Sequence, residues 1–525
     1  METRSAKRRK LMLLQVNSNE EEYEDEEEEE PKVDRISDLP DHILHCILKL
    51  LPIKSAAQTA ILSSRWKNVF SNIPDLDFRT LLTSSKCMCK THQYSIKLII
   101  TDLKFIKQVL NLRQKNSSIR TLKLSGSITF TDLHNLFKYV TRHDIQELDL
   151  DLKIKDHFNF PRSIINCDSL KILRLRSSFY GFRISPSSVI RCGRFKSLHT
   201  LSLSMILFHV EPTSPDLFTD LTFPCLKNLL LDCCYCLKEL NIRCRGLENL
   251  FIMNCNQLNK LDIVGLKLER LNVDCCFNKS SMNNKVIINA PIIKHVELIY
   301  NVIIHTIVMD KSILLESTVI NLFLLQFDNN LIEPVKRHNL SNMINAFSRT
   351  KSLTLESGSI EILSRNDADN ILVNKFESLK KLEIETQYDQ FNGYNNYPAI
   401  ATLFENSPYV ETLVITTMNI EKFQRRPLLD LREYTTQVED KYWGDRVPKM
   451  NSFFNHLRMF KFDGFLECDK DISLVMFLIK HGNVLEEVIL CLGKGKKRQL
   501  ASRERIMSMM MSFSWASSKG RIVFE

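Results

Sequence analysis

The fold of this 525-residue chain is decided by three copies of one six-residue pattern: Leu226-Lys-Asn-Leu-Leu-Leu231, Leu247-Glu-Asn-Leu-Phe-Ile252 and Leu268-Glu-Arg-Leu-Asn-Val273. The copies recur with a constant period of about 21 residues, which indicates a repeat architecture. Each unit supplies one short strand. Because side chains alternate along a strand, we expect the leucines to point into a continuous stack and the intervening residues to face a concave surface.

Further copies extend the repeat in both directions. They begin at Ile119, Ile145, Leu170, Leu198, Ile293, Leu379 and Val410. The early copies lie roughly 25–28 residues apart, and such periods are typical of leucine-rich repeats. The longer spacing leaves about 15 residues for a helix, as over 131–140, so the sequence predicts an α/β solenoid with a parallel sheet. The register between about 300 and 375 stays open, because the pattern is degraded there.

Two additional copies lie midway between the tightly spaced ones, at Leu237-Lys-Glu-Leu-Asn-Ile242 and Leu258-Asn-Lys-Leu-Asp-Ile263. Each short repeat in this section therefore contains two strand-like segments. A second strand in so short a unit leaves no room for a long helix. We expect strands on both faces of the solenoid there.

The cysteines of this section suggest a zinc site at first sight. However, Cys234, Cys255 and Cys276 recur with the same spacing as the leucines, and each lies eight residues after the first leucine of its copy. Leucine-rich repeats place an inward-pointing Asn or Cys there. A ladder with one Cys per turn does not converge on one ion, so we interpret these residues as structural. Cys87 and Cys89 with His92 form a weaker metal candidate without a clear fourth ligand, and a plain linker is the alternative.

Three short helices are predicted before the repeats. Residues 36–52 have apolar residues at helical spacing, and Pro40 suits the first turn. Asp38 is expected to cap this helix through its side chain. A second helix is expected over 54–62 and a third over 64–73. Three helices of this length cannot bury enough surface to be stable alone, so they should pack on a partner or on the repeats.

This helical segment resembles an F-box of the plant type. The match runs from Leu39-Pro40-Asp41 through Leu50-Leu51-Pro52 to Arg65-Trp66-Lys67. The resemblance implies binding to a Skp-type adaptor, which connects to cullin and RING subunits. It assigns the contact to the Leu-Pro start, the apolar ridge of the first helix and the Trp helix: Leu39, Pro40, Asp41, Ile43, Leu44, Ile47, Leu50, Leu51, Pro52, Arg65 and Trp66. The alternative is a helical hairpin that only caps the solenoid, and it does not explain the whole series.

The C-terminal segment is similar to the FBD module that follows the repeats in plant F-box proteins. Trp443-Gly-Asp-Arg-Val-Pro448 leads to a predicted strand near 456–464, a helix over 471–480, and strands over 484–490 and 521–524. The opening Cys-Leu of many members is replaced by Asn-Ser-Phe-Phe, ending at Phe454. We interpret the module as a strand-helix-strand cap on the open end of the solenoid, with a separate binding role as the alternative.

Charge divides the chain into a tail and a body. Residues 1–30 carry 5 basic and 11 acidic residues, so the remainder has 66 basic against 51 acidic. The basic residues are spread evenly along the body, which favours ordinary solubility or an acidic protein partner over nucleic acid. The acidic run over 20–30 predicts a disordered tail. Lys7-Arg-Arg-Lys10 is a weak nuclear import signal, so we expect a nuclear or cytoplasmic protein with free thiols.

No membrane span or secretion signal is expected, because charged residues interrupt the apolar stretch over 292–315 and the apolar part of the N-terminus is short. The sequence contains no G-x-x-x-x-G-K-[ST], G-x-G-x-x-G, H-E-x-x-H or G-x-S-x-G motif. We interpret His199, His295 and His456, which fall within predicted repeat strands, as surface or hydrogen-bonded residues. The sequence thus predicts no catalytic residue, cofactor or metal site.

Four segments follow from these patterns: a disordered tail over 1–33, the F-box over 34–80, leucine-rich repeats over 81–440 and the FBD module over 441–525. The resemblance implies the substrate-recognition subunit of a Skp-cullin-F-box ubiquitin ligase, a non-catalytic adaptor. A non-ligase interaction scaffold that uses the F-box only for assembly stays open as the alternative. Charged outward strand positions are the candidate contacts for an unknown target protein: Lys123, Asp149, Arg174, Arg176, Asp262 and Glu297.

Overall fold

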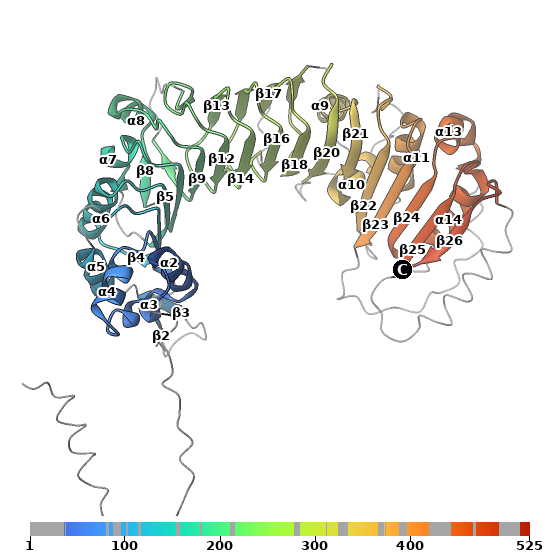
Figure 1. The fold of residues 1–525 in the computed structure, drawn as a ribbon. Coiled ribbons are helices and arrows are strands. Elements are labelled where there is room, and N and C mark those ends of the chain that lie inside the picture. The colour runs from blue at the N-terminus through green and yellow to red at the C-terminus, as the bar shows by residue number, and fades with distance from the viewer. Residues whose placement is uncertain are drawn as a thin grey trace, which may run out of the picture.

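The protein is a single arch of repeated strands, as a computed structural model shows (Figure 1). The structure describes residues 36, 38–79, 83–87, 96–100, 103–113, 117–153, 158–178, 181–209, 216–277, 284–310, 312–323, 334–365, 372, 374–387, 396–418, 443–465, 469–492 and 515–525. Three short helices form one end of the arch, and the last strands form the other. Within these ranges, no helix has the length and apolar character needed to cross a bilayer.

A parallel sheet of 16 strands runs through the whole arch and confirms the predicted solenoid. In spatial order it contains β1 (Asp75–Asp77), β4 (Thr121–Ser127), β5 (Glu147–Lys153), β7 (Ile172–Ser178), β9 (Thr200–Ser204), β12 (Asn228–Asp232), β14 (Asn249–Met253), β16 (Arg270–Asp274), β18 (His295–Asn301), β20 (Leu315–Leu322), β21 (Thr350–Leu355), β22 (Lys381–Gln387), β23 (Thr412–Met418), β24 (Met459–Phe465), β25 (Glu487–Leu492) and β26 (Arg521–Phe524). Consecutive repeats therefore stack side by side in the order of the chain.

The repeated leucines hold these strands together. Leu229 of β12 pairs with Leu250 of β14, which pairs with Leu271 of β16, and all three side chains are buried. Burying one leucine contributes roughly 1.5–3 kcal/mol. The residues between the leucines are only partly buried, so each strand has an inner and an outer row. Because the apolar row of one repeat is covered only by its neighbours, the repeats are stable as a stack.

The predicted section with strands on both faces is confirmed. The half-repeats form β13 (Glu239–Arg243) and β15 (Lys260–Val264) of a second, five-stranded parallel sheet. This sheet also contains β11 (Phe218–Thr219), β17 (Lys285–Asn289) and β19 (Thr306–Met309). Two smaller sheets precede it: β6 (Phe158–Asn159), β8 (Phe182–Ile184) and β10 (Leu207–Phe208), and the antiparallel pair of β2 (Thr83–Cys87) and β3 (Ile96–Ile100).

Helices occur where the repeats are longer, as the spacing predicts. They are α5 (Leu103–Leu112), α6 (Phe130–Arg142), α7 (Arg162–Ile165), α8 (Pro186–Cys192), α9 (Pro334–Asn345), α10 (Ser357–Arg365) and α11 (Tyr397–Asn406). The helix expected over 131–140 is α6, whose first turn is capped by Thr129 through a 3.2 Å hydrogen bond from the Asp132 N–H. The register left open between about 300 and 375 is now defined: β20 pairs with β21, and α9 lies between them in the chain.

The N-terminal helices are α2 (Asp41–Leu50), α3 (Ile53–Thr59) and α4 (Ser64–Ser71). The predicted cap of the first helix was wrong. Pro40 and not Asp38 occupies the cap position, and no side chain of the described residues caps it. The backbone N–H groups of Ile43 and Leu44 donate to the Pro40 carbonyl, so the helix begins beyond the reach of Asp38. In α4 the cap is Ser63, whose Oγ accepts the Trp66 N–H at 3.2 Å.

The C-terminal segment continues the main sheet. It contains α13 (Val447–Phe454), β24, α14 (Asp469–His481), β25 and β26, which confirms the predicted strand-helix-strand unit. Aromatic residues cover the junction with the preceding repeat: the rings of Phe404 and Phe453 stack with centroids 4.3 Å apart. Two histidines lie beside the strands and not within them, His199 before β9 and His456 in the turn before β24.

The cysteine ladder is confirmed as part of the core. Cys234, Cys255 and Cys276 are buried, and the Cys276 thiol lies 3.1 Å from the Asp274 carbonyl and 3.3 Å from the Ile252 carbonyl. No set of three His, Cys, Asp or Glu side chains among the described residues is arranged to hold a metal. Some predictions concern residues outside the described ranges: the tail over 1–33 with Lys7-Arg-Arg-Lys10, and Cys89 with His92. The side chain of Cys87 also lies outside them.

Candidate interaction surfaces

The three-helix module has its own small core. Leu44 and Leu48 of α2, Ile53 of α3 and Trp66 of α4 are buried in it. Other large apolar side chains of the module are exposed to solvent. Their exposed fractions are Ile43 38%, Ile47 36%, Leu50 85%, Leu51 40%, Ile61 85% and Leu62 70%. An exposed apolar group of this size on a small module indicates a surface that binds a protein partner.

Two of the predicted adaptor contacts are buried inside the module. Leu44 and Trp66 are only 0% and 7% exposed, so they support the surface from inside. Ile61 and Leu62 are exposed but are not among the predicted contacts. They follow α3 and precede the Ser63 cap of α4, so they do not belong to the apolar stripe of either helix. Their position in the turn before a helix cap was the sequence feature that could have indicated their exposure.

The start of α2 is held by α4. The Arg65 guanidinium donates to the Leu39 carbonyl at 2.5 Å and to Asp41 Oδ1 at 3.0 Å. Leu39 is partly buried against the core, while Pro40 and Pro52 are exposed. The predicted contacts Arg65 and Asp41 are therefore well placed to fix the geometry of this end of the surface.

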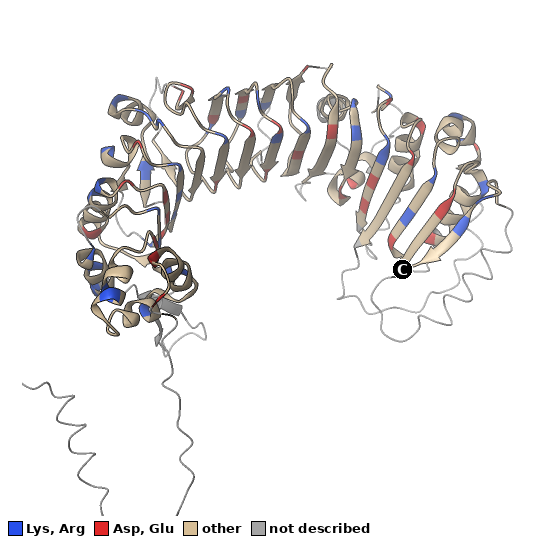
Figure 2. Ribbon diagram, in the orientation of Figure 1, with Lys and Arg blue, Asp and Glu red and all other residues tan. Residues whose placement is uncertain are grey.

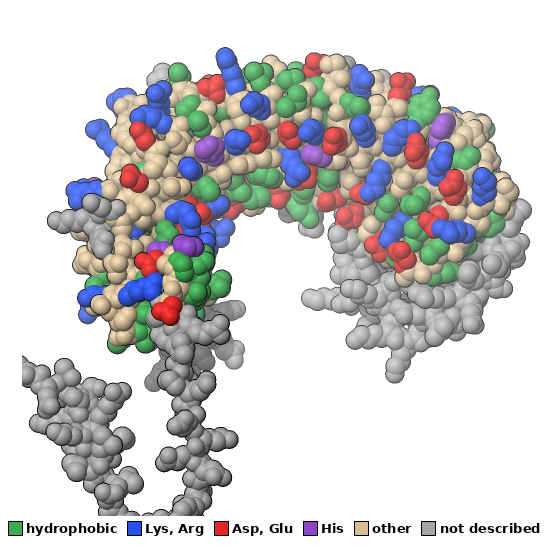
Figure 3. Space-filling view, viewed as in Figure 1, with side chains coloured by type: hydrophobic (Ala, Val, Ile, Leu, Met, Phe, Trp, Pro, Cys, Tyr) green, Lys and Arg blue, Asp and Glu red, His purple; other side chains and the backbone are tan. Residues whose placement is uncertain are grey.

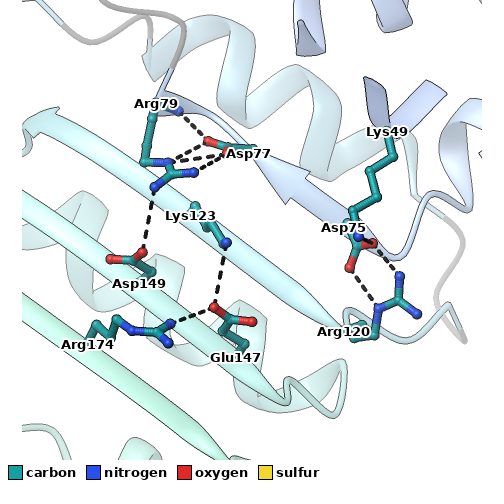
Figure 4. A network of polar contacts seen from close by, with 9 residues as sticks. All are labelled: Lys49, Asp75, Asp77, Arg79, Arg120, Lys123, Glu147, Asp149 and Arg174. Carbon is teal, nitrogen blue, oxygen red and sulfur yellow. Dashed lines mark hydrogen bonds and ion pairs between the residues drawn. The ribbon is translucent and has the colours of Figure 1, made fainter. Parts of the chain in front are cut away.

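The module is joined to the solenoid through Asp75 of β1 (Figure 4). Lys49 of α2 lies 3.2 Å from the Asp75 carboxylate, and Arg120 Nε donates to it at 2.9 Å. Burial raises the pKa of Asp75, but the hydrogen bonds and charges of Arg120 and Lys49 outweigh burial and lower that pKa to about 2. One carboxylate thus connects the helical module to the first strands of the repeat sheet.

Backbone and buried side-chain contacts strengthen this junction. The strand β1 pairs in parallel with β4, and the Phe78 N–H donates to the Lys123 carbonyl at 2.8 Å. The nearly buried Arg113 donates to the Ile73 carbonyl at 2.5 Å and to the Ser118 carbonyl at 2.9 Å. Because strand pairing, ion pairs and buried hydrogen bonds all cross this boundary, the module is a fixed end of the sheet.

Three of the predicted target contacts lie together on the outer row of the first repeats (Figure 4). Lys123 and Arg174 both approach Glu147, at 3.6 and 2.6 Å. Asp149 lies 3.8 Å from Arg79, which also pairs with Asp77. Their charges are largely compensated within the protein. Exposed ion pairs of this kind contribute roughly 0–1 kcal/mol each.

The remaining predicted contacts do not join this group. Arg176 of β7 is 61% exposed and lies 3.8 Å from Asp232. Glu297 lies on β18, far along the sheet. Asp262 belongs to β15 of the five-stranded sheet and pairs with Arg243 at 2.9 Å. It therefore lies on a different sheet from the other predicted target contacts, in agreement with its position in a half-repeat.

The fold and these surfaces define a protein with a helical docking module fused to a leucine-rich repeat solenoid. The F-box domain pattern matches residues 36–87. The leucine-rich repeat domain described as At1g61320/AtMIF1 matches residues 180–521. A putative F-box/FBD/LRR-repeat protein of Arabidopsis thaliana, At4g03220, is 35% identical over 537 residues and covers 100% of both chains.

Other Arabidopsis thaliana relatives are more distant but also match at nearly full length. The F-box/FBD/LRR-repeat protein At1g78750 is 22% identical over 484 residues, which cover 89% of this chain and 92% of the relative. The putative F-box/LRR-repeat protein At3g18150 is 24% identical over 477 residues, covering 88% and 87%. The chain belongs to the plant F-box/FBD/LRR-repeat family.

Proposed function

We propose that this protein is the substrate-recognition subunit of a Skp-cullin-F-box ubiquitin ligase. The observation that carries the proposal is the exposed apolar surface of the helical module, from Ile43 to Leu62. An F-box generally binds a Skp-type adaptor. The adaptor would connect to cullin and RING subunits, while the repeats hold a target protein. The chain itself would act by proximity and effective concentration and would catalyse no step.

We propose that the protein acts in the nucleus or the cytoplasm. Lys7-Arg-Arg-Lys10 supports the nucleus weakly. The proposal needs neither a cofactor nor a metal, and the partner expected on the repeats is a protein and not a nucleic acid or a membrane.

Adaptor binding tests the proposal directly. Leu50 and Ile61 are each 85% exposed, so Leu50→Glu/Ile61→Glu should leave the fold intact and place two charges on the binding surface. In a pull-down with a purified Skp-type adaptor, we expect the wild type to bind and this variant to bind at least roughly tenfold more weakly.

The matched control is Leu221→Glu, because Leu221 is 83% exposed but lies on the solenoid. It should bind the adaptor like the wild type. Absence of adaptor binding by the wild type would refute the receptor role.

A second assay separates the receptor from the scaffold alternative. A receptor should support ubiquitination of a bound partner, and this ubiquitination should depend on the adaptor. A scaffold would support none.

A further inference from the structure

The outer row of the main sheet changes character in the middle of the arch. From β12 to β22 it carries six carboxylates, which we call the acidic face. They are Asp232, Asp274, Glu297, Glu356, Glu383 and Glu385. The strand registers place five of them at the second and third outward positions of their strands, and Glu356 directly follows the end of β21. Residues that are far apart in the sequence thus share one surface.

The cations of the described strands lie outside these positions. Between β9 and β23 the second and third outward positions of the described strands contain no Lys, Arg or His. The nearest cations lie at the margins, where Arg176 is 3.8 Å from Asp232 and Lys381 pairs with Glu383. Figure 2 shows acidic positions on several of these strands, and Figure 3 shows acidic and hydrophobic side chains along the inner side of the arch. The acidic face is therefore only partly neutralised.

Neutral donors from neighbouring strands position these carboxylates. Asn272 donates to Glu297, and Asn321 donates to Glu356. Asn254 donates to Asp232 Oδ1 at 3.0 Å. An amide fixes a carboxylate in place but leaves its negative charge uncompensated. The carboxylates are thus held in fixed positions and keep a negative charge that can bind a cationic group.

The carboxylates of the acidic face fall into two groups by pKa. Burial raises the pKa of Asp232 and Glu383, but their hydrogen bonds and the nearby cations Arg176 and Lys381 outweigh burial and lower it. The second group has no such cation among the described residues. Burial raises the pKa of Asp274, Glu356 and Glu385, and other carboxylates of the acidic face raise each pKa further. Oδ1 of Asp274 is also buried without a hydrogen-bond partner in the described part of the chain. A cationic partner would relieve this mutual repulsion, because opposite charge favours the ionised carboxylate.

Apolar side chains lie among the carboxylates. Leu230, Phe251, Met253 and Ile299 occupy outward positions of β12, β14 and β18 and are partly exposed. At the ends of the adjacent strands β18 and β20, Tyr300 is 53% exposed and Phe323 is 50% exposed. The Phe323 N–H donates to the Asn301 carbonyl at 2.8 Å, so these two aromatic residues belong to neighbouring turns. Exposed aromatics beside carboxylates suit arginine and lysine through cation–π contacts and apolar side chains through burial.

We propose that the acidic face binds a segment of a partner protein in which lysine or arginine alternates with apolar residues. The inference rests on the proposed function, because it names the class of target that the repeats would hold. Charge complementarity selects this occupant: a nucleic acid or an acidic peptide would be repelled. The basic run Lys7-Arg-Arg-Lys10 of this chain has no apolar residue among its basic residues, unlike the proposed partner segment.

Three synthetic peptides of equal length test the proposal on the full chain, by fluorescence anisotropy. The first combines lysine, arginine, leucine and phenylalanine, the second replaces its apolar residues by serine, and the third replaces its basic residues by glutamate. We expect the first to bind best, the second at least roughly tenfold more weakly, and the third not at all, with affinity for the first falling as salt is raised. Equal binding of the first two would refute the proposed role of the apolar residues.

Variants locate the binding surface. Asp274→Asn/Glu297→Gln/Glu356→Gln removes three charges and keeps the hydrogen-bond acceptors, and it should weaken binding of the first peptide by roughly tenfold. The matched control removes three carboxylates that lie outside the acidic face and outside the predicted target contacts: Glu239→Gln/Glu248→Gln/Glu269→Gln. It should bind like the wild type. Equal weakening by both triple variants would show non-specific charge attraction and would overturn the proposal.

A second variant tests the aromatic residues without changing charge. Tyr300→Asn/Phe323→Ser keeps a residue that tolerates the left-handed backbone of position 300, where φ is 51°. It should weaken binding severalfold, and unchanged binding would refute the aromatic contribution.

The adaptor pull-down on the same preparations separates the two proposals. A chain that binds adaptor but no peptide disproves the acidic face, and one that binds peptide but no adaptor disproves the ligase role.

Discussion

One inward-pointing side chain at or just after the end of each central strand forms hydrogen bonds with nearby backbone groups. Asn301 continues the ladder of Cys234, Cys255 and Cys276, eight residues after Ile293. Its Nδ2 donates to the Val273 and Ile299 carbonyls at 2.8 and 2.9 Å. Its Oδ1 accepts the N–H groups of Cys276 and Phe277, both at 3.0 Å. A cysteine supplies the donor but leaves these N–H groups to other acceptors.

We predict that Asn301→Ala lowers the stability of the central repeats by about 2–4 kcal/mol, because it removes the four hydrogen bonds of a buried side chain and leaves two backbone N–H groups without an acceptor. Urea unfolding followed by circular dichroism measures the effect. The exposed Asn259→Ala should change the free energy of unfolding by a few tenths of a kcal/mol at most. Equal midpoints for the two variants would contradict the role of the ladder.

At the residue scale, sequence spacing predicted the buried cysteines but not which residues of the helical module are exposed. The ladder has a strict period, so its position in the repeat defines its direction. In α2, by contrast, Ile43 and Leu44 are adjacent, as are Ile47 and Leu48. Both members of each pair fit an apolar helical stripe. Only the packing of α2 on α3 and α4 turns Leu44 and Leu48 inward and leaves the isoleucines exposed.

At the scale of elements, the three-residue strand β1 joins the helical module to the main sheet. It carries no L-x-x-L-x-L pattern, and Asp75-Leu-Asp77 is typical of a turn after Pro74. No local pattern therefore indicated that the helical module enters the main sheet. In the structure, β1 pairs with the edge of β4. A strand edge can bind any segment that presents backbone N–H and C=O groups, so no special side-chain pattern is needed.

Asp75→Asn should destabilise this junction in a pH-dependent way. Because the pKa of Asp75 is lowered to about 2 in the folded protein, its charge contributes stability above pH 4, and this contribution is lost as pH falls from about 4 to about 2. We expect a loss of about 1–2 kcal/mol near neutral pH, discounted for solvent screening, and convergence of the two proteins near pH 2.

Thermal unfolding at a series of pH values measures this difference. The control is Asp168→Asn, because Asp168 forms an exposed ion pair with Lys196 at 2.7 Å and should contribute little at any pH. A difference between wild type and Asp75→Asn that stays constant from neutral to acid pH would contradict the assignment.

At the scale of the whole molecule, the acidic face could not be predicted from the sequence. Its carboxylates extend from position 232 to position 385, and no local pattern connects them. The repeat register alone brings them together, and that register was undefined between about 300 and 375. The fold class and the second sheet were predictable, because they depend on spacing within one repeat. A surface formed across many repeats depends on the register of all of them.

Removal of residues 443–525 should destabilise the remaining solenoid. The deletion uncovers β23, whose Leu413 and Ile415 pair with Phe460 and Phe462 of β24. Terminal repeats need a cap, because an exposed apolar edge favours aggregation. We expect a lower thermal midpoint and loss of soluble protein on heating, with adaptor binding retained at the other end of the arch. A truncated chain that unfolds like the full chain would show that this segment does not act as a cap.

The strand β1 fixes the three-helix module at the first position of a regularly spaced sheet. Neighbouring strands lie roughly 4.8 Å apart, so the fifteen steps from β1 to β26 measure about 70 Å along the arch. Each repeat that is gained or lost between those ends would shift the far end by one such step and also turn it about the solenoid axis. In a protein built this way, the distance from the three-helix module to any position on the sheet changes only by whole repeats.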